Sequence, residues 1–409
     1  MTARPVHLVV GGGLAGATAA VRLREAGFDG RIVLVGEEPG EPYERPPLSK
    51  EYLRGERDRD AVLVHPPAAY ADAGVELLAG TRVTAVDPAA GVAVLDGGER
   101  LRWDRLLLAT GSSARRLPVP GADLDGVHHL RTLADADALA AGLRRAGRVV
   151  VVGAGWIGTE VAASARALGR DVVVVAPDDV PLQRVLGAEL GAVFRDLHAE
   201  HGVDLRLGTG VDAVVGTGSV EGVRLGDGTV VEADLVVAGV GAVPRTELAE
   251  AAGLAVDGGG VVVDAHLRAS APGVFAAGDI ASAWHPHYRR HVRVEHWANA
   301  RHQGAAAARS MLGAGEPYDR LPYFFTDQYD LGMELSGDPT GAARVVVRGD
   351  VAERRFVAFW LDGEDRVLAA MNVNVWDVVD GLQALIRSGR PATTADLDAA
   401  LTAGGRPVG

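Results

Sequence analysis

The sequence predicts an α/β protein with two Rossmann-like, doubly wound domains and a small α+β domain at its carboxyl end. The main observation is a repeat, because "VVGGGLAG" at residues 9–16 recurs as "VVGAGWIG" at residues 151–158. A glycine-rich turn between a buried strand and a helix is the phosphate-binding part of a dinucleotide-binding domain. The second observation is a change to short strands from about residue 322, which predicts the third domain.

The first copy has every part of a βαβ unit. A buried strand at residues 8–10 precedes Gly11, Gly13 and Gly16, a helix follows, and residues 31–36 form a second strand. In such a turn the first glycine permits the tight bend, the second lets a pyrophosphate approach the backbone, and the third lets helix and strand pack closely. The helix N-terminus then offers free N–H groups to the phosphates.

The second copy repeats this arrangement. Its strand lies at residues 149–152, its turn contains Gly153, Gly155 and Gly158, and its return strand lies at residues 171–176. A single glycine motif also occurs for packing reasons alone. Two complete units favour two bound dinucleotides.

Composition excludes several classes of protein. A chain of 409 residues is too long for one ordinary core, so two or three domains are expected. The 41 basic and 54 acidic residues give a formal charge of −13, which opposes general binding to nucleic acid. The chain contains no cysteine, so it cannot pass electrons through a redox-active dithiol, a sulfenic acid or a thiolate-bound metal.

No part of the sequence predicts a membrane segment. None of its apolar runs approaches the roughly 18 residues that a membrane helix needs. The opening "MTARPVHLVV" enters the first strand directly, so we expect no signal peptide. A cytoplasmic protein without a membrane partner is therefore expected.

Three further strands indicate the order of the domains. Buried strands that end in glycine turns are predicted within residues 106–113, 233–244 and 273–281. Because the last of them follows the second βαβ unit, we expect the chain to cross back and complete the first domain. The expected boundaries are residues 1–114 and 245–320 for the first domain, 115–244 for the second and 321–409 for the third.

The third domain is predicted to contain three antiparallel strands and one helix. The strands are expected at residues 343–349, 355–361 and 366–372, and the helix at about 376–387. The last stretch of the chain shows no pattern that predicts an element.

Taken together, the motifs resemble one family over essentially the whole chain, and they occur in the same order. The sequence is similar to the FAD-dependent, NAD(P)H-oxidising ferredoxin reductases of bacterial P450 and dioxygenase systems, of the putidaredoxin reductase type. These share their fold with the apoptosis-inducing factor flavoproteins. Besides the two glycine motifs, the resemblance depends on "PYERPPLSK" (42–50), "LLLATGSS" (106–113), "GWIGTEVA" (155–162), "VFAAGDIA" (274–281) and "VEHWANARHQG" (294–304).

The resemblance implies that the first domain binds FAD and the second binds NAD(P)H. The residues implied for FAD are Gly11, Gly13, Leu14, Ala15, Gly16, Glu37, Glu38, Arg45, Lys50, Ala109, Thr110, Gly111, Gly278 and Asp279. Val83 and Arg131 are implied for cofactor binding, without assignment to one of the two nucleotides. Those implied for the nicotinamide coenzyme are Gly153, Gly155, Trp156, Ile157, Gly158 and Gly241, and those beside the flavin are Glu295, His296, Trp297 and Phe325.

Several of these residues have simpler alternative roles. Glu37 or Glu38 would bind the adenosine ribose, but both could be solvated loop acids. Asp279 would bind the ribityl or phosphate region, or could cap a turn. Arg45 and Lys50 would line the flavin, or could be exposed charges in a rigid proline loop.

The resemblance assigns catalytic roles to Lys50, Glu160 and Trp156. Lys50 would pair with Glu160 beside the flavin, because an unpaired carboxylate in an apolar helix turn is costly. An exposed Glu160 that only interacts with the helix dipole is the alternative. Trp156 would cover the flavin until nicotinamide displaces it, or could simply pack between helix and sheet.

The coenzyme site departs from the usual pattern. Ala176 occupies the place of the acidic residue that normally selects NAD, and no arginine lies between Asp171 and Gln183 to hold the 2′-phosphate of NADP. Asp178 or Asp179 could act from a shifted loop and would repel a phosphate. NADH is therefore expected in preference to NADPH.

Trp297 would stack near the ring system or pack in the core. The run "PYFFTDQY" (322–329) resembles a family segment that often reads "FWSDQY". Phe325 stands at its usual tryptophan position, which weakens any electron path through an indole there.

Histidines and arginines give weaker signals. His285 with His287, and His198 with His201, are expected on a solvated surface rather than at a metal, and no metal site is predicted. Arginine clusters could dock an acidic ferredoxin or be solvated surface; they are Arg289, Arg290, Arg293, Arg344, Arg348, Arg354 and Arg355.

The function implied is hydride transfer from NADH to FAD, followed by single-electron transfer to an iron–sulfur ferredoxin that feeds a P450 or a Rieske-type oxygenase. Two alternatives stay open: an NADH oxidase, and an NADH-sensing flavoprotein. Full oxygen or peroxide reduction tends to need a cysteine, which this chain lacks.

Overall fold

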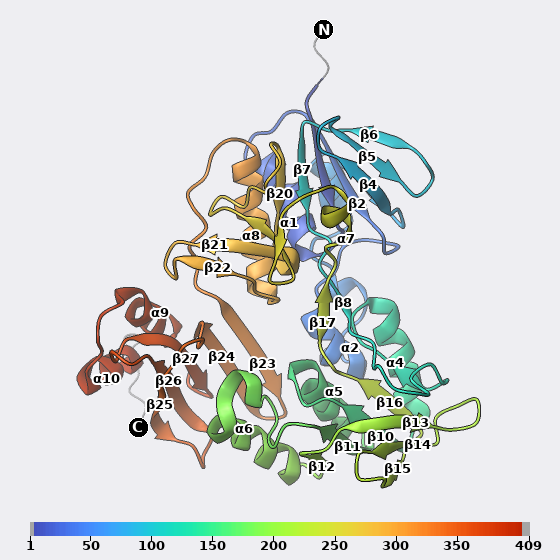
Figure 1. Ribbon diagram of the computed structural model, residues 1–409, viewed down its shortest axis with the longest axis vertical. Helices are drawn as coiled ribbons and strands as arrows, with labels where there is room; N and C mark the ends of the chain where they lie inside the picture. Colours follow the sequence, from blue (N-terminus) through green and yellow to red (C-terminus); the bar gives the residue numbers. More distant parts are fainter. Residues whose placement is uncertain (1–3, 403–409) are drawn as a thin grey trace. The chain divides into compact units, whose positions relative to one another are not determined.

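The computed structural model describes residues 4–402, and its elements group into two compact units (Figure 1). Unit 1 contains residues 4–44, 59–113 and 243–322, and unit 2 contains residues 45–58, 114–242 and 323–402. A unit is a group of elements in contact and need not be one domain, so the three-domain division stays a prediction.

Unit 1 is built on a parallel five-stranded sheet in the order β20-β7-β1-β2-β3. The central strand β1 is rich in β-branched residues, and its Leu8 and Val9 are fully buried, as expected for a strand covered on both faces. The prediction that the chain crosses back to this sheet is confirmed by β20. The strands are β1 (Val6–Val10), β2 (Arg31–Gly36), β3 (Val75–Ala79), β7 (Arg105–Leu108) and β20 (Val274–Ala276).

Two helices of unit 1 pack closely on each other. They are α1 (Leu14–Glu25) and α8 (Trp297–Met311), and a Cβ added to Gly304 of α8 would lie 2.3 Å from the carbonyl oxygen of Ala15. The remaining elements are β4 (Val83–Asp87), β5 (Val92–Leu95), β6 (Arg100–Arg102), β18 (Val256–Asp257), β19 (Gly260–Val263), β21 (Ala281–His285), β22 (Arg290–Val292), η2 (Asp60–Val62), α3 (Ala68–Asp72), α7 (Glu247–Ala251) and η3 (Gly278–Ile280).

Unit 2 contains a second parallel sheet in the order β12-β11-β10-β16-β9. The predicted second βαβ unit is confirmed, with α5 between β10 and β11. The elements are β9 (Val127–His128), β10 (Arg148–Val152), β11 (Asp171–Ala176), β12 (Asp204–Leu207), β13 (Val211–Val215), β14 (Gly222–Leu225), β15 (Val230–Glu232), β16 (Leu235–Ala238), η1 (Pro46–Ser49), α2 (Glu51–Arg54), α4 (Leu133–Arg145), α5 (Trp156–Ala167) and α6 (Gln183–Glu200). Short strands β8 (Ser112–Ala114) and β17 (Ala242–Pro244) contain two of the places where the chain passes between units.

The carboxyl-terminal part of unit 2 is an antiparallel sheet in the order β23-β24-β27-β26-β25. The three predicted strands are confirmed as β25 (Arg344–Asp350), β26 (Arg355–Leu361) and β27 (Val367–Val373), and the predicted helix as α9 (Val379–Ser388). The sequence missed β23 (Tyr323–Gln328), β24 (Leu331–Gly337) and α10 (Thr394–Thr402). Strand β24 contains Gly332 near its start and Gly337 at its end, and glycine is unfavourable in strands.

The glycines in the loop of unit 2 differ in whether the fold itself requires them. Gly153 has φ +106°, a conformation that other residues rarely adopt. A Cβ on Gly158 would lie 2.0 Å from the carbonyl oxygen of Gly153, so α5 could not start so close to β10. A Cβ on Gly155 would meet no atom within 4 Å, so packing within the protein does not require that glycine.

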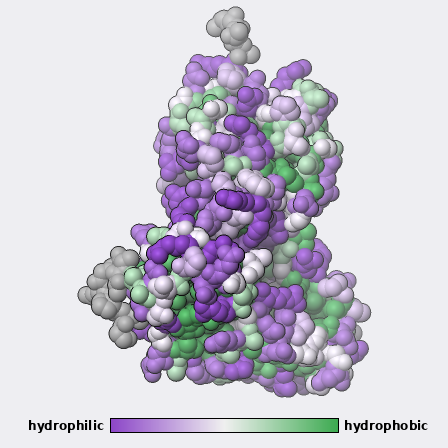
Figure 2. All heavy atoms as spheres, turned by 60° about the vertical axis from the view of Figure 1, so that its left-hand side comes forward, coloured by the Kyte–Doolittle hydropathy of each residue, from purple (hydrophilic) through white to green (hydrophobic). Residues whose placement is uncertain are grey.

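The helices of the described residues were compared with the length and hydropathy that a membrane span needs. Within residues 4–402, every helix is too short or too polar to cross a bilayer. On the face drawn in Figure 2, hydrophilic residues cover most of the surface and apolar residues lie among them in separate patches.

The glycine loop gives a testable prediction. Gly158→Ala should lower the free energy of unfolding by about 2–4 kcal/mol, because its Cβ has no space. Gly155→Ala should change it by less than about 1 kcal/mol and instead weaken coenzyme binding, because the added Cβ points into open space. Urea unfolding and coenzyme titration measure the two effects; equal stability of both variants would contradict this account.

Candidate active site

The first glycine loop lies between β1 and α1 in unit 1. The Gly11 N–H donates to the carbonyl oxygen of Val35 at 2.8 Å, which fixes the start of the turn. Gly13 is the N-cap of α1 and no side chain caps this helix. The first turn of α1 therefore keeps backbone N–H groups for an anionic ligand, as a dinucleotide pyrophosphate requires.

Residues from three strands gather around this loop. The carbonyl oxygen of Ala109 lies 2.1 Å from where a Cβ on Gly11 would stand, and a Cβ on Gly278 would lie 3.2 Å from that of Ala15. Asp279 is buried and accepts a hydrogen bond from Ser112 Oγ at 3.0 Å. Unit 1 thus brings together Gly11, Gly13, Leu14, Ala15, Gly16, Ala109, Thr110, Gly111, Gly278 and Asp279, as an FAD site needs.

Two acidic residues follow β2. Glu37 contacts two arginines, Arg245 at 2.5 Å and Arg82 at 3.8 Å, and Glu38 accepts a hydrogen bond from the Tyr43 hydroxyl. Val83, the next residue after Arg82, is buried at the start of β4. The sequence does not predict this role for Arg245, because Arg245 follows the strand and glycine turn at residues 233–244 and no motif marks it.

The start of α8 carries the other predicted residues of unit 1. Glu295 pairs with Arg293, His296 is the N-cap and Trp297 is the first residue of the helix. The Arg301 guanidinium lies 5.3 Å from the ring centroid of Trp297, a cation–π contact. A role of these residues at a flavin stays a prediction.

The second glycine loop, in unit 2, fits a nucleotide. The Gly153 N–H donates to Val175 O at 2.8 Å, and Ile157 is 43% exposed at the start of α5. Because Gly155 has open space where a side chain would be, a pyrophosphate close to the backbone explains this glycine better than packing. Gly241 follows β16, and its carbonyl oxygen accepts from Arg115 N–H at 2.9 Å.

The positions predicted to select the coenzyme lie at and just beyond the carboxyl end of β11. Ala176 ends the strand, and Asp178 forms an ion pair with Arg184 at 3.3 Å. The Arg184 side chain is 77% exposed. Arg184 lies one residue beyond the stretch in which the sequence predicts no arginine, so the local pattern does not mark it.

An ion pair between Lys50 and Glu160 is present in unit 2. Lys50 Nζ lies 2.8 Å from Glu160 Oε1, and the two side chains are 7% and 4% exposed. The alternative of an exposed Glu160 at the helix terminus is therefore wrong. The position of the pair beside a flavin stays a prediction.

Two hydroxyl groups complete the surroundings of Glu160. Ser49 Oγ donates to Oε2 at 2.5 Å, and Thr326 Oγ1 donates to Oε1 at 2.6 Å. A buried carboxylate is tolerated only when charge and hydrogen bonds compensate the loss of water, and here three side chains do so. Sequence analysis named neither hydroxyl, although both lie inside motifs it quoted.

The aromatic residues near this pair pack within unit 2. Trp156 lies 4.5 Å from Phe324 and 6.1 Å from Phe194, measured between ring centroids. This is the packing role considered for Trp156, and its covering of a flavin stays a prediction. Lys50 Nζ lies 5.7 Å from the ring centroid of Phe325.

Two other predicted cofactor-binding residues, Arg45 and Arg131, belong to unit 2. Arg45 is the N-cap of η1, and the backbone N–H of Arg131 donates to Asp135 Oδ2 at 3.0 Å ahead of α4. Their contact with a cofactor stays a prediction.

The expectation of solvated histidines is wrong for two of them. His198 is fully buried, with Nε2 at 2.9 Å from Gln328 Oε1, and His285 is buried against Arg320 O at 2.9 Å. Their partners lie far away in sequence, so no local pattern predicts this burial. No group of three or more metal-binding side chains occurs in the described part of the chain.

Several arginines of the basic clusters are engaged in ion pairs. Arg293 pairs with Glu295, as noted, and three more of these arginines pair with acidic residues at 2.5–3.0 Å. These pairs are Arg344 with Asp365, Arg348 with Asp398 and Arg354 with Glu200. Their positive charge is therefore partly neutralised.

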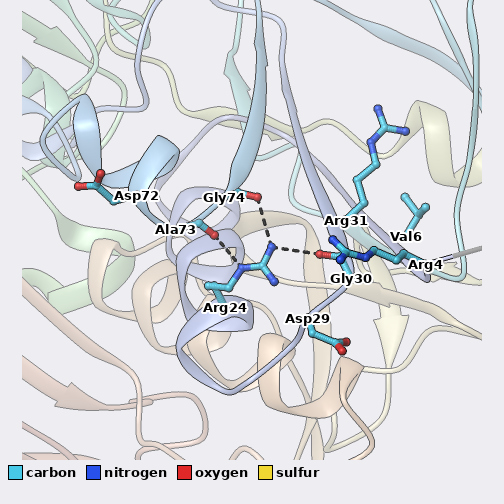
Figure 3. Close-up of a pocket in the computed structure, with 9 residues that line it drawn as sticks. All are labelled: Arg4, Val6, Arg24, Asp29, Gly30, Arg31, Asp72, Ala73 and Gly74. Carbon is cyan, nitrogen blue, oxygen red and sulfur yellow. Dashed lines mark hydrogen bonds between the residues drawn. The ribbon is translucent and has the colours of Figure 1, made fainter.

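A pocket of about 670 Å³ lies away from the glycine loop, near the first residues of β1 and β2 (Figure 3). Arg24 reaches into it and donates to the carbonyl oxygens of Ala73, Gly30 and Gly74 at 2.8, 3.0 and 3.3 Å. Because these bonds occupy the guanidinium, the pocket fits a structural role rather than a nucleotide site.

Comparison with known proteins identifies the family of the chain. Residues 6–304 match the family described as pyridine nucleotide-disulphide oxidoreductase, and residues 323–402 match the one described as reductase C-terminal. Rhodocoxin reductase of Rhodococcus erythropolis is 42% identical over 368 residues, which are 90% of this chain and 86% of the relative. Putidaredoxin reductase of Pseudomonas putida is 40% identical over 380 residues, 91% and 90% of the two chains.

A solved structure shows the same likeness. The reductase in the covalent putidaredoxin reductase–putidaredoxin complex superposes with a TM-score of 0.92 at 38% identity, over 96% of this chain and 95% of that one. The resemblance drawn from the motifs is confirmed. Because the family match extends from residue 6 to residue 304 and these relatives align over nearly the whole chain, the chain belongs to the pyridine nucleotide-disulphide oxidoreductase family.

Proposed function

We propose that the chain is a flavoprotein ferredoxin reductase that oxidises NADH and passes single electrons to an iron–sulfur ferredoxin of an oxygenase system. The observation that carries this function is alignment at about 40% identity, over almost the whole chain, with reductases of such systems. Another relative of this kind is the ferredoxin–NAD(+) reductase component of the anthranilate 1,2-dioxygenase system of Burkholderia cepacia, 40% identical over 395 residues. The oxygenase served is a cytochrome P450 or a ring-hydroxylating dioxygenase.

The residues present fit both nucleotides. The uncapped N-terminus of α1 and the glycines around it suit FAD, and the open space at Gly155 suits NADH. Bound FAD supplies the conversion of an electron pair from NADH into single electrons for a ferredoxin. The chain itself has no cysteine, so the disulphide chemistry in the family's name is absent from it.

The chain's own residues bind, orient and balance charge. The first turns of α1 and α5 hold pyrophosphates by backbone N–H groups. Lys50 places a positive charge against the buried Glu160 carboxylate, and Ser49 and Thr326 keep that carboxylate oriented. We assign the pair to the flavin side of the site.

NADH is the proposed coenzyme. Asp178 puts a carboxylate just beyond the carboxyl end of β11, where it would accept a hydrogen bond from the ribose 2′-hydroxyl of NADH. Its ion pair with Arg184 offsets part of the charge that would repel the 2′-phosphate of NADPH. Since NADH is a cytoplasmic reductant, we place the protein in that compartment. The ferredoxin is proposed to be acidic, and it would meet arginines that the ion pairs leave only partly neutralised.

The function gives a direct prediction. Protein loaded with FAD should be reduced rapidly by NADH in stopped-flow absorbance, because both nucleotides bind to one chain. Adding a [2Fe–2S] ferredoxin and cytochrome c should then give ferredoxin-dependent cytochrome reduction. The matched control omits the ferredoxin. A flavin that reoxidises only with oxygen, whatever ferredoxin is offered, would instead favour an NADH oxidase, and slow reduction with a long-lived charge-transfer complex would favour an NADH sensor.

The buried ion pair gives a second prediction. Glu160→Gln should lower the free energy of unfolding by about 3 kcal/mol, because it leaves the Lys50 charge buried without its counter-ion. Glu160→Gln should also slow flavin reduction by NADH. Adding Lys50→Met should restore much of the lost stability but not the rate of flavin reduction. Urea unfolding and stopped-flow kinetics measure the two. A double variant as unstable as Glu160→Gln would show that the charge pair is not the cause.

Coenzyme selectivity gives a third prediction. Asp178→Asn should raise kcat/KM for NADPH about tenfold, since it removes one negative charge near the 2′-phosphate while keeping a group that binds the 2′-hydroxyl of NADH. Asp171→Asn changes the same charge at the other end of β11 and is the control. Steady-state kinetics with both coenzymes decide, and the idea is wrong if the two variants behave alike.

A further inference from the structure

A continuous row of buried polar side chains runs through unit 2 beyond Glu160. Thr326 and Gln328 of β23 and His198 of α6 are each at most 1% exposed. Most buried polar side chains find hydrogen-bond partners, and each contact along this row is short enough for its donor and acceptor to be assigned.

The Gln328 amide lies at the middle of the row. Its Nε2 is 3.0 Å from Thr159 Oγ1 and 3.3 Å from Thr326 Oγ1, and its Oε1 is 2.9 Å from His198 Nε2. An amide nitrogen only donates and an amide oxygen only accepts. Both threonine hydroxyls therefore accept from Gln328, and His198 donates to it.

The proton of each threonine hydroxyl then has one destination. Thr159 Oγ1 donates to the carbonyl oxygens at the start of its own helix, 3.0–3.1 Å away. Thr326 Oγ1 donates to Glu160 Oε1 at 2.6 Å. The bonds from His198 through Gln328 and Thr326 thus point toward Glu160, while Thr159 forms a side branch that ends on the backbone of α5.

His198 selects this direction through its tautomer. Burial lowers the pKa of His198 to about 4, so near neutral pH the ring carries one N–H. Because Nε2 faces an oxygen that can only accept, the proton lies on Nε2. Nδ1 then accepts from the Tyr329 hydroxyl at 3.2 Å.

The other tautomer would change the surroundings of Glu160. With the proton on Nδ1, the bare Nε2 would need a donor, and the Gln328 amide would turn over. Its oxygen would then face Thr326, which would donate to Gln328 and present a lone pair to Glu160. The carboxylate would lose one of its three side-chain donors.

The far end of the row is held firmly. Tyr329 adopts φ +56° between β23 and β24, which is unusual for a large side chain. Its ring stacks on His201 with centroids 3.7 Å apart and planes 13° apart. The two-residue turn between Gln328 and Leu331 itself requires a positive φ at its first residue, so the turn fixes the backbone of Tyr329, and the stacking on His201 holds its ring in place.

We propose that His198 and Gln328 are positioning residues for the Lys50–Glu160 pair. The tautomer of His198 fixes the Gln328 amide, and the amide directs the Thr326 proton to Glu160. The row by itself follows from the contacts of unit 2, while its effect on turnover rests on the proposed function.

The first test needs neither NADH nor a ferredoxin. The full-length protein is labelled with ¹⁵N-histidine, and two-dimensional NMR at pH 7 reports which ring nitrogen carries the proton; His198→Gln assigns the signal. A proton on Nε2 of His198 supports the proposal. A proton on Nδ1, or an equal mixture of the two forms, overturns it.

The second test separates positioning from packing. His198→Leu should slow flavin reduction by NADH about tenfold in single turnover, whereas His198→Gln keeps an N–H donor for Gln328 and should slow it less than about threefold. Both variants lose the ring, so a role in packing alone predicts equal rates, and that result overturns the proposal.

A second pair of variants tests the same proposal if His198→Leu does not fold. Thr326→Ser keeps the hydroxyl and Thr326→Val keeps the shape, so only Thr326→Val should show the tenfold loss. Equal rates for these two variants also overturn the proposal. If NADH does not reduce the flavin of the unaltered protein, the proposed function fails, and the NMR measurement still decides whether the row is directed as proposed.

Discussion

The buried carboxylate of Glu160 is the interaction on which the arrangement of unit 2 depends. It ties together three parts of the chain that are distant in sequence: Lys50 and Ser49 of the short 45–58 stretch, the second turn of α5, and Thr326 of β23. A charge so far from water is stable only with all its partners in place. The same bonds therefore connect the helix that follows the second glycine loop to the proline-rich stretch and to the carboxyl-terminal sheet.

Much of this could be predicted from sequence, because the determining signals are local. The glycine turns at Gly11 and Gly153 and the apolar strands beside them specify the two βαβ units with little help from the rest of the chain. The Lys50–Glu160 pair came from family resemblance, since nothing local connects residues so far apart. What the sequence could not supply is the remainder of the polar row: His198 has the pattern of any helix histidine, and its burial arises only when Gln328 and Tyr329 fold over it.

The missed elements have similar causes. Strand β24 contains glycines that weaken its strand pattern, and it is defined by pairing with β23 and β27 rather than by its own propensity. Arg184 and Arg245 each pair with an acidic residue that the sequence analysis had already considered, Asp178 and Glu37. Local sequence patterns therefore predict the acidic residue of each pair, whereas its arginine partner is evident only in the folded structure.

The interleaving of the two units has a consequence for how the protein is made. The unit 1 sheet needs β20, which is synthesised after all of β9–β16, and the early 45–58 stretch belongs with elements that emerge much later. Such long-range pairing raises contact order and delays folding on the ribosome until most of the chain has emerged. Until then β7 is an open edge strand, the kind of surface that chaperones shield from aggregation.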